Sequence, residues 1–109
     1  MDNTDDTIRR FFALDAAGDL DGLIALFADD ATVVDEAQTH RGTDSIRAWR
    51  ADVASKFTYT TEILAITNGG PGRFLVEGRI TGDFPGGVAD LKWDFALADG
   101  RIRRLMIAP

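Results

Sequence analysis

The chain has no cysteine, and this absence excludes disulfide bonds, thiolate nucleophiles and thiolate metal ligands. Histidine occurs once, at His40, so no second histidine or cysteine exists to complete a usual zinc site. Nothing in the sequence has the spacing of a phosphate loop or a dinucleotide fingerprint. We therefore expect neither a metal nor another cofactor.

Positive charge is also scarce. The chain has 12 Lys and Arg against 18 Asp and Glu, which gives a formal net charge of −6. Phosphate contacts need clustered basic side chains, whereas the only crowded ones here are Arg101, Arg103 and Arg104, a pattern typical of a solvated strand face. We expect no nucleic acid as a partner.

Long hydrophobic runs are missing. No apolar run approaches the ~20 residues that cross a bilayer, and the acidic segment 1–6 lacks the apolar core of a secretion signal. We expect no membrane partner and a cytoplasmic location. What is present, 45% hydrophobic and 28% charged residues over 109 positions, is typical of one globular domain over residues 1–109.

The first half of the chain has the spacing of three amphipathic helices. Their buried faces are expected to comprise Ile8, Phe11 and Phe12, then Leu20, Leu23, Ile24 and Phe27, and then Ile46, Trp49, Arg50 and Val53. Gly18 is expected to end the first helix, Asp19 to cap the second and Thr43 to cap the third. For Arg50 we expect a stem packed on the core and a charged head in solvent.

From residue 57 onward the period is that of strands. Runs at 57–66, 73–82, 88–98 and 101–108 are separated by Gly, Pro, Asn and Asp residues that favour turns. A short strand at 32–35 precedes the third helix. Helices followed by a meander predict an α+β fold, in which a curved antiparallel sheet of five strands wraps around three helices.

Alternation of apolar and charged residues predicts the strand register. Pairing Gly78 with Leu91 or Trp93 places the apolar sets of both strands on one inner face and brings Arg79 near Asp90 or Asp94. The inward-facing residues then include Phe74, Val76, Ile80, Leu91, Trp93, Phe95 and Leu97. Tyr59 is expected on the same face, close to Gly78.

The last hairpin contains a conflict. A turn at Asp99-Gly100 pairs Leu97 with Ile102, and simple alternation would then turn Leu105 outward. A β-bulge near Arg103–Arg104 would return Leu105 to the interior, so we predict that bulge.

Asp35 is the first candidate for chemistry because it stands where the strand 32–35 ends. A carboxylate that moves a proton to or from carbon needs a partly dry site, and the alternative is a solvated Asp at a strand end. His40 follows in a loop, where it could bind Asp35 or a ligand carbonyl, or simply be exposed. Trp49, Tyr59 and Trp93 could each offer a single donor to a ligand, or pack in the core.

Three segments carry a resemblance to a known superfamily: FADDATVVDE at 27–36, GDLD at 18–21 and DGRI at 99–102. They resemble the nuclear transport factor 2-like superfamily, which includes SnoaL-like polyketide cyclases and ketosteroid isomerases, over nearly the whole chain. The resemblance implies a cone-shaped fold, a hydrophobic cavity at its open end and a homodimer through the outer sheet face.

The resemblance also implies roles for residues. In ketosteroid isomerases the matching strand ends in an Asp that acts as general base, which implies this role for Asp35. Their oxyanion hole uses a Tyr and a protonated Asp, whereas the matching positions here hold Phe11 and Trp93. Steroid isomerisation is therefore not expected.

The function we expect is a SnoaL-like enzyme that performs cofactor-free isomerisation, cyclisation or hydration on a small, apolar molecule that contains a carbonyl group or a ring. Asp35 would exchange the proton, and His40 or Tyr59 would polarise the substrate oxygen. The expected contacts of the substrate are Phe11, Trp49, Val76, Trp93 and Phe95. The alternative is a non-catalytic ligand-binding or dimerisation module, because one fold serves both uses.

Overall fold

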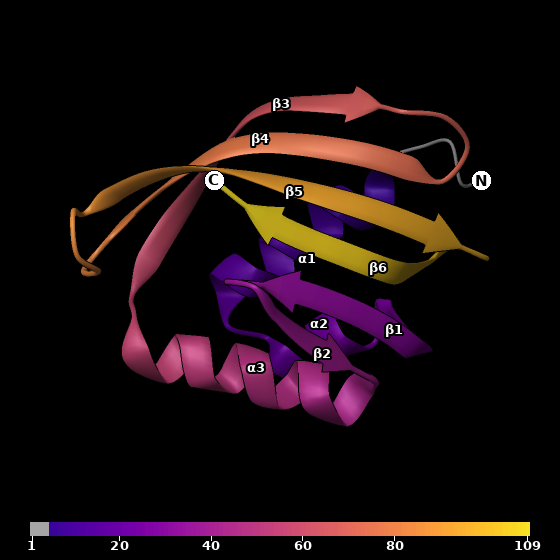
Figure 1. The fold of residues 1–109 in the computed structure, drawn as a ribbon, viewed down its shortest axis with the longest axis horizontal. Coiled ribbons are helices and arrows are strands. Elements are labelled where there is room, and N and C mark those ends of the chain that lie inside the picture. The colour runs from indigo at the N-terminus through magenta and orange to yellow at the C-terminus, as the bar shows by residue number, and fades with distance from the viewer. Residues whose placement is uncertain (1–4) are drawn as a thin grey trace.

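Three helices and one curved sheet make up the protein, for which a computed structural model describes residues 5–109. The start of the acidic N-terminal segment, residues 1–4, lies outside the described residues. The helices are α1 (Asp6–Ala17), α2 (Leu20–Ile24) and α3 (Thr43–Lys56). Figure 1 shows α1 and α2 behind the sheet and α3 below it, beside β2. No helix within residues 5–109 is long and apolar enough to cross a membrane.

The sheet has six strands in the order β2-β1-β6-β5-β4-β3. Their bounds are β1 (Phe27–Asp35), β2 (Gln38–Arg41), β3 (Tyr59–Asn68), β4 (Arg73–Gly82), β5 (Val88–Ala98) and β6 (Arg101–Ala108). Neighbouring strands run antiparallel except β1 and β6, which are parallel. The predicted α+β class is confirmed, whereas the prediction of five strands, all antiparallel, was wrong.

The hairpin formed by β1 and β2 was not predicted. Glu36 and Ala37 join the two strands, and both have positive φ angles, 52° and 62°. Turns of this kind usually contain glycine or asparagine, so the sequence carried no signal for this one. His40 consequently lies in β2 and not in a loop. Phe27, which we expected on the second helix, begins β1 instead.

Two of the three predicted helix boundaries are confirmed. Gly18 ends α1 with a left-handed φ of 71°. Asp19 caps α2, since its side chain accepts the backbone N–H of Gly22 at 2.9 Å. For α3 the N-cap is Gly42, and Thr43 is the first helical residue, so the predicted cap was wrong by one position.

The central register of the sheet is the predicted one. Gly78 lies opposite Leu91, and Arg79 lies opposite Asp90. Arg79 Nε donates to Asp90 Oδ1 at 2.8 Å on the outer face. The inner face is buried at Phe74, Val76, Trp93 and Phe95.

The predicted β-bulge in the last hairpin is confirmed. The register shifts between Ala96 and Leu97, which leaves Arg103 as the extra residue of β6. Leu105 is therefore returned to the interior, where it is fully buried.

A second β-bulge, in β3, was not predicted. Leu64 is its extra residue, and half of Leu64 is exposed. Ile63 lies opposite Gly78, and Tyr59 lies four positions away, opposite Gly82. The prediction that Tyr59 is close to Gly78 was therefore wrong.

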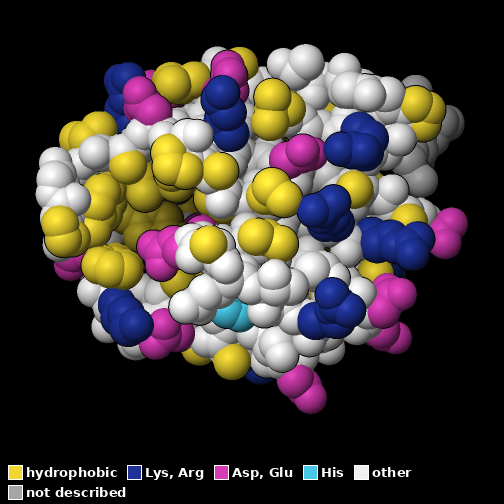
Figure 2. All heavy atoms as spheres, viewed as in Figure 1, with side chains coloured by type: hydrophobic (Ala, Val, Ile, Leu, Met, Phe, Trp, Pro, Cys, Tyr) yellow, Lys and Arg dark blue, Asp and Glu magenta, His cyan; other side chains and the backbone are white. Residues whose placement is uncertain are grey.

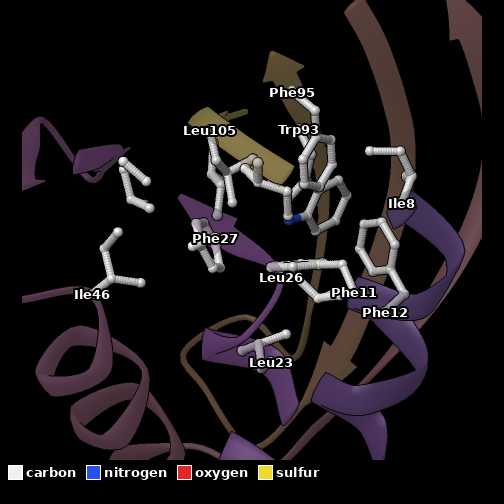
Figure 3. Close-up of a cluster of buried hydrophobic side chains, with 14 of the residues drawn as sticks. Ile8, Phe11, Phe12, Leu23, Leu26, Phe27, Ile46, Trp93, Phe95 and Leu105 are labelled. Atoms are coloured by element: carbon white, nitrogen blue, oxygen red, sulfur yellow. The ribbon is translucent and has the colours of Figure 1, made fainter. Parts of the chain in front are cut away.

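Aromatic rings form the centre of the core (Figure 3). Phe11 of α1 makes edge-to-face contacts with Phe27 and Phe95, at ring-centroid distances of 6.2 and 5.3 Å. Phe12 makes a similar contact with Trp93 at 5.2 Å. These rings fix α1 against the inner face of the sheet.

Candidate functional site

A cavity of about 620 Å³ opens on the surface of the protein, between α3 and the sheet. Figure 2 shows the opening as a hollow surrounded mainly by hydrophobic side chains. Its apolar lining includes Val53, Phe57, Ile80, Phe84, Ala89, Leu91, Trp93 and Ile107. Pockets for small molecules usually measure about 300–1,000 Å³ and are mostly apolar, so this cavity has the size and character of a ligand site.

One wall of the cavity is the loop between β4 and β5, which is tied to the segment before β3. Asp83 accepts the backbone N–H of Thr58 at 2.8 Å and returns its own backbone N–H to the Thr58 carbonyl at 3.1 Å. Phe84 packs edge-to-face on Phe57 at 6.4 Å. A Cβ atom at Gly82 would lie 2.3 Å from the Thr58 carbonyl oxygen, so this close approach needs glycine.

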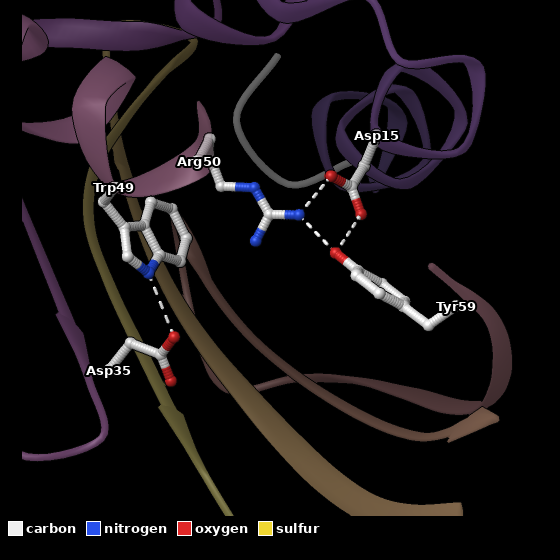
Figure 4. Close-up of polar contacts among 5 residues, drawn as sticks. All are labelled: Asp15, Asp35, Trp49, Arg50 and Tyr59. Carbon is white, nitrogen blue, oxygen red and sulfur yellow. Dashed lines mark hydrogen bonds and ion pairs between the residues drawn. The ribbon is translucent and has the colours of Figure 1, made fainter. Parts of the chain in front are cut away.

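Asp35 lies in the wall of this cavity, as the last residue of β1. The side chain is half-buried, and its Oδ2 accepts the indole N–H of Trp49 at 3.0 Å (Figure 4). The hydrogen bond satisfies the buried indole and orients the carboxylate. The structure thus joins two predicted site residues that lie on different elements.

His40 packs against Trp49, the residue that binds Asp35. The two rings stack at a centroid distance of 5.8 Å and an interplanar angle of 29°. His40 is not among the residues that line the cavity, and within the described part of the chain it makes no hydrogen bond to Asp35. Its predicted action on a substrate oxygen stays a prediction.

Arg50 is a site residue that the sequence reasoning missed. We expected its head in solvent, and this was wrong, because only 9% of the side chain is exposed and it forms an ion pair with Asp15 of α1. The same nitrogen, Nη2, donates to the hydroxyl of Tyr59, and Tyr59 donates to Asp15 Oδ2 at 3.0 Å. Figure 4 shows the three side chains converging from α1, α3 and β3. We call them the Asp15–Arg50–Tyr59 triad.

Burial and neighbouring charges together set the pKa values of Arg50 and Tyr59. Burial alone would lower the pKa of Arg50, but the negative charge of Asp15 and the hydrogen bonds outweigh it, so the pKa of Arg50 is raised. Burial raises the pKa of Tyr59 against the opposing effect of the Arg50 charge. At neutral pH the guanidinium is therefore charged and the phenol neutral.

Only one of the five residues predicted to contact the substrate lines the cavity, and the others lie in the core or support Asp35. Trp93 lines the cavity, whereas Phe11, Val76 and Phe95 are fully buried in the core and Trp49 supports Asp35. A direct ligand contact by these four residues stays a prediction. Ile80 and Leu91 also line the cavity, although we had not predicted them as substrate contacts. Both belong to the inner sheet face that strand alternation had identified.

The cavity wall combines a carboxylate, Asp35, with a buried cation, Arg50, and the phenol of Tyr59. Such a set can accept a proton from a ligand and stabilise negative charge on one of its oxygens. Among residues 5–109 no group of three or more His, Cys, Asp or Glu side chains could hold a metal ion.

Comparison with known proteins places the chain in a family. The SnoaL-like domain model matches residues 8–105. A candidate polyketide cyclase from Sinorhizobium meliloti is 36% identical, with a TM-score of 0.91 and 94% of each chain covered. A protein from Sphaerobacter thermophilus is 28% identical over 99% of this chain and 96% of its own, with a TM-score of 0.81.

A third structure shares the fold. This protein from Catenulispora acidiphila has a ketosteroid isomerase-like fold and was crystallised in complex with trimethylamine. It is 19% identical, with a TM-score of 0.86 and coverage of 97% of this chain and 86% of its own. The family model spans most of the chain, and the Sinorhizobium relative matches it in sequence and structure. The chain therefore belongs to the SnoaL-like domain family and has the nuclear transport factor 2-like fold.

Proposed function

We propose that the cavity binds a small, largely apolar molecule that carries a carbonyl group, and that Asp35 exchanges a proton with a carbon atom of it. The reaction class is isomerisation or cyclisation without a cofactor. One observation carries this proposal: Asp35 lies in the wall of an apolar cavity of about 620 Å³ with its carboxylate held by Trp49. We take residues 1–109 as one domain that acts in the cytoplasm, as the sequence predicts.

The local chemistry supports a proton transfer. The hydrogen bond from Trp49 uses Oδ2 of Asp35, so the other carboxylate oxygen is outside that contact. A carboxylate that is oriented beside a bound molecule reacts as if it were at very high concentration. The apolar lining limits the water that would otherwise solvate the carboxylate and the ligand. The Sinorhizobium relative, named as a candidate polyketide cyclase, supports the same class.

The alternative is a module that binds a ligand, or a second copy of itself, without catalysis. The Catenulispora protein, crystallised with trimethylamine, favours ligand binding as a use of this fold. Ligand binding needs the cavity but not the proton transfer by Asp35, so the two functions separate on substitution of this one residue.

The test uses β-tetralone, a bicyclic ketone with acidic C–H bonds beside its carbonyl group, in deuterated water. We expect the protein to accelerate the exchange of these hydrogens for deuterium, followed by proton NMR. Asp35→Asn keeps the shape of the side chain but removes the base, so the accelerated rate should fall about 10²–10⁴-fold. Asp44→Asn, an exposed position in the first turn of α3, is the matched control and should exchange at the wild-type rate.

Binding is measured separately, from the indole N–H signal of Trp93 in NMR spectra, because this ring lines the cavity. Binding without accelerated exchange would favour the non-catalytic module. If neither β-tetralone nor related cyclic ketones shift the Trp93 signal, the cavity is not a site for this class of molecule.

A further inference from the structure

We propose that Arg50 is the hydrogen-bond donor that holds the substrate oxygen in this cavity, and that the substrate is a neutral carbonyl compound that becomes an enolate. This inference rests on the proposed function, because it supplies the partner that Asp35 needs. Arg50 would touch the substrate, and Asp15 and Tyr59 would act as positioning residues.

An inventory of donors points to Arg50. Tyr59 has a single O–H, and it donates this hydrogen to Asp15 at 3.0 Å. Trp49 likewise gives its single indole N–H to Asp35. Lys56 lines the mouth of the cavity but is well exposed and paired with Asp52 at 3.1 Å.

Arg50 has donors left over. A guanidinium carries five N–H groups, and the bonds of Arg50 to Asp15 and Tyr59 both use Nη2. Figure 4 shows its second terminal nitrogen turned away from both partners. Arg50 also lines the cavity. A charged N–H donor binds an oxygen more strongly than the neutral indole of Trp93, which also lines this cavity.

The triad holds this donor in place before a ligand arrives. The side chains of Arg50 and Asp15 are only 9% and 17% exposed. The guanidinium carbon of Arg50 also lies 4.7 Å from the centroid of the Trp49 ring. The same indole binds Asp35, so one side chain of α3 contacts both the base and the donor. Donors fixed in this way stabilise a developing negative charge without reorganisation.

Charge balance selects a neutral carbonyl compound over a carboxylate. Asp15 already neutralises Arg50, and Asp35 adds a negative charge to the wall, so a permanent anion would meet net repulsion. A ketone adds no charge. When Asp35 takes a proton from the carbon beside the carbonyl, the C–H bond breaks and the carboxylate becomes neutral. The electron pair moves to the oxygen at Arg50. In a β,γ-unsaturated ketone the resulting dienolate takes the proton back from Asp35 at its γ-carbon, the double bond moves into conjugation with the carbonyl group, and the isomerisation is complete.

The test compares β-naphthol, an aromatic mimic of the enolate of β-tetralone, with naphthalene, which lacks the oxygen. We expect wild-type protein to bind β-naphthol about tenfold or more tightly than naphthalene. Arg50→Met and Arg50→Lys should remove this preference and leave naphthalene affinity unchanged. Their exchange of β-tetralone should fall about 10²–10³-fold with Asp35 intact. Arg50→Lys keeps a cation beside Asp15, so it carries the test where Arg50→Met does not fold.

The matched control is Arg47→Met. Arg47 lies on the same helix and pairs with Asp21 at 2.7 Å, but it is exposed, so both the preference and the exchange should stay at wild-type values. Equal losses of affinity for β-naphthol and naphthalene in the Arg50 variants would mean that Arg50 has a purely structural role, and would overturn the inference.

Other outcomes separate this inference from the proposed function. If Asp35→Asn abolishes exchange but the Arg50 variants keep both exchange and oxygen preference, the inference fails and the proposed function stands. If Trp93→Phe, and not Arg50→Lys, removes the preference, the donor is Trp93 and the inference fails. Tighter binding of β-naphthoate than of β-naphthol would overturn the choice of a neutral substrate.

Discussion

Tyr59 is the only tyrosine of the chain, so the absorbance of phenolate in solution reports this one side chain. Burial raises its pKa above 10.0, and the nearby charge of Asp15 acts in the same direction, while Arg50 opposes them. We expect the phenolate absorbance of the folded protein to appear at higher pH than that of free tyrosine. Asp15→Asn should shift the midpoint down from the wild-type value, since it removes one cause of the increase.

The same titration has a consequence for stability. Because the pKa of Tyr59 is higher in the folded than in the unfolded protein, its contribution to the unfolding free energy is fully present below the unfolded value of about 10. This contribution is lost as the pH rises through the folded pKa. Urea unfolding on both sides of that value should show a smaller alkaline loss of stability in Tyr59→Phe than in wild type. An equal loss in the two proteins would contradict this account.

The contacts within the site that the sequence could not predict join residues far apart in the chain. Helical spacing placed Arg50 on the apolar side of α3, and the structure confirms that side as buried. A buried guanidinium needs a carboxylate, but the partner, Asp15, lies 35 residues earlier and on another helix. No local pattern connects such a pair. The contact of Trp49 with Asp35 escaped prediction for the same reason, although both residues were candidates.

At the scale of elements, Gly78 of β4 packs against Trp93, a residue of the cavity wall. A Cβ atom there would lie 2.8 Å from the Glu62 carbonyl oxygen and 2.9 Å from Cζ3 of Trp93. Gly78→Ala should therefore lower the unfolding free energy by about 1–3 kcal/mol and displace the Trp93 ring. Urea unfolding and the Trp93 indole N–H signal measure the two effects.

The matched control for that substitution is Gly69→Ala in the loop between β3 and β4. The nearest atom to a Cβ at Gly69 is the Cβ of Arg73 at 3.7 Å, an ordinary contact. We expect a change in unfolding free energy within about 0.5 kcal/mol, typical of a surface site. Equal effects of the two substitutions would show that the contact with Trp93 is not what excludes a side chain from Gly78.

Strands were predictable where alternation and turn residues agree. The bulge at Arg103 followed from a conflict between the Asp99-Gly100 turn and the need to bury Leu105, which left one consistent solution. The bulge at Leu64 created no such conflict, because the glycine-rich loop 69–72 that follows β3 did not fix the pairing of β3 with β4 from the sequence. The β1–β2 turn lacked glycine, and the parallel pairing of β1 with β6 joins segments far apart in the sequence.

At the scale of the whole molecule, the triad ties α1 and α3 to the edge strand β3. Asp15→Asn removes the charge that neutralises a buried guanidinium, and we expect a loss of about 3–5 kcal/mol in unfolding free energy. Asp21→Asn is the control: it breaks the exposed pair with Arg47, where the side chains are 45% and 87% exposed, and should change stability by about 0–1 kcal/mol. Similar losses in the two variants, measured by urea unfolding, would mean that the triad is not a main link.

The outer face of the sheet is the predicted surface for a homodimer. Leu64, Val88 and Met106 are exposed there, and Figure 2 shows acidic, basic and apolar side chains mixed over this face. A two-fold axis places the same patch on both partners, so a mixture of charges can pair with its own copy. We expect sedimentation to show a dimer that Met106→Glu converts to monomers, while Ala48→Glu, exposed on α3, leaves it intact. Monomers at every concentration of the wild-type protein would contradict the prediction.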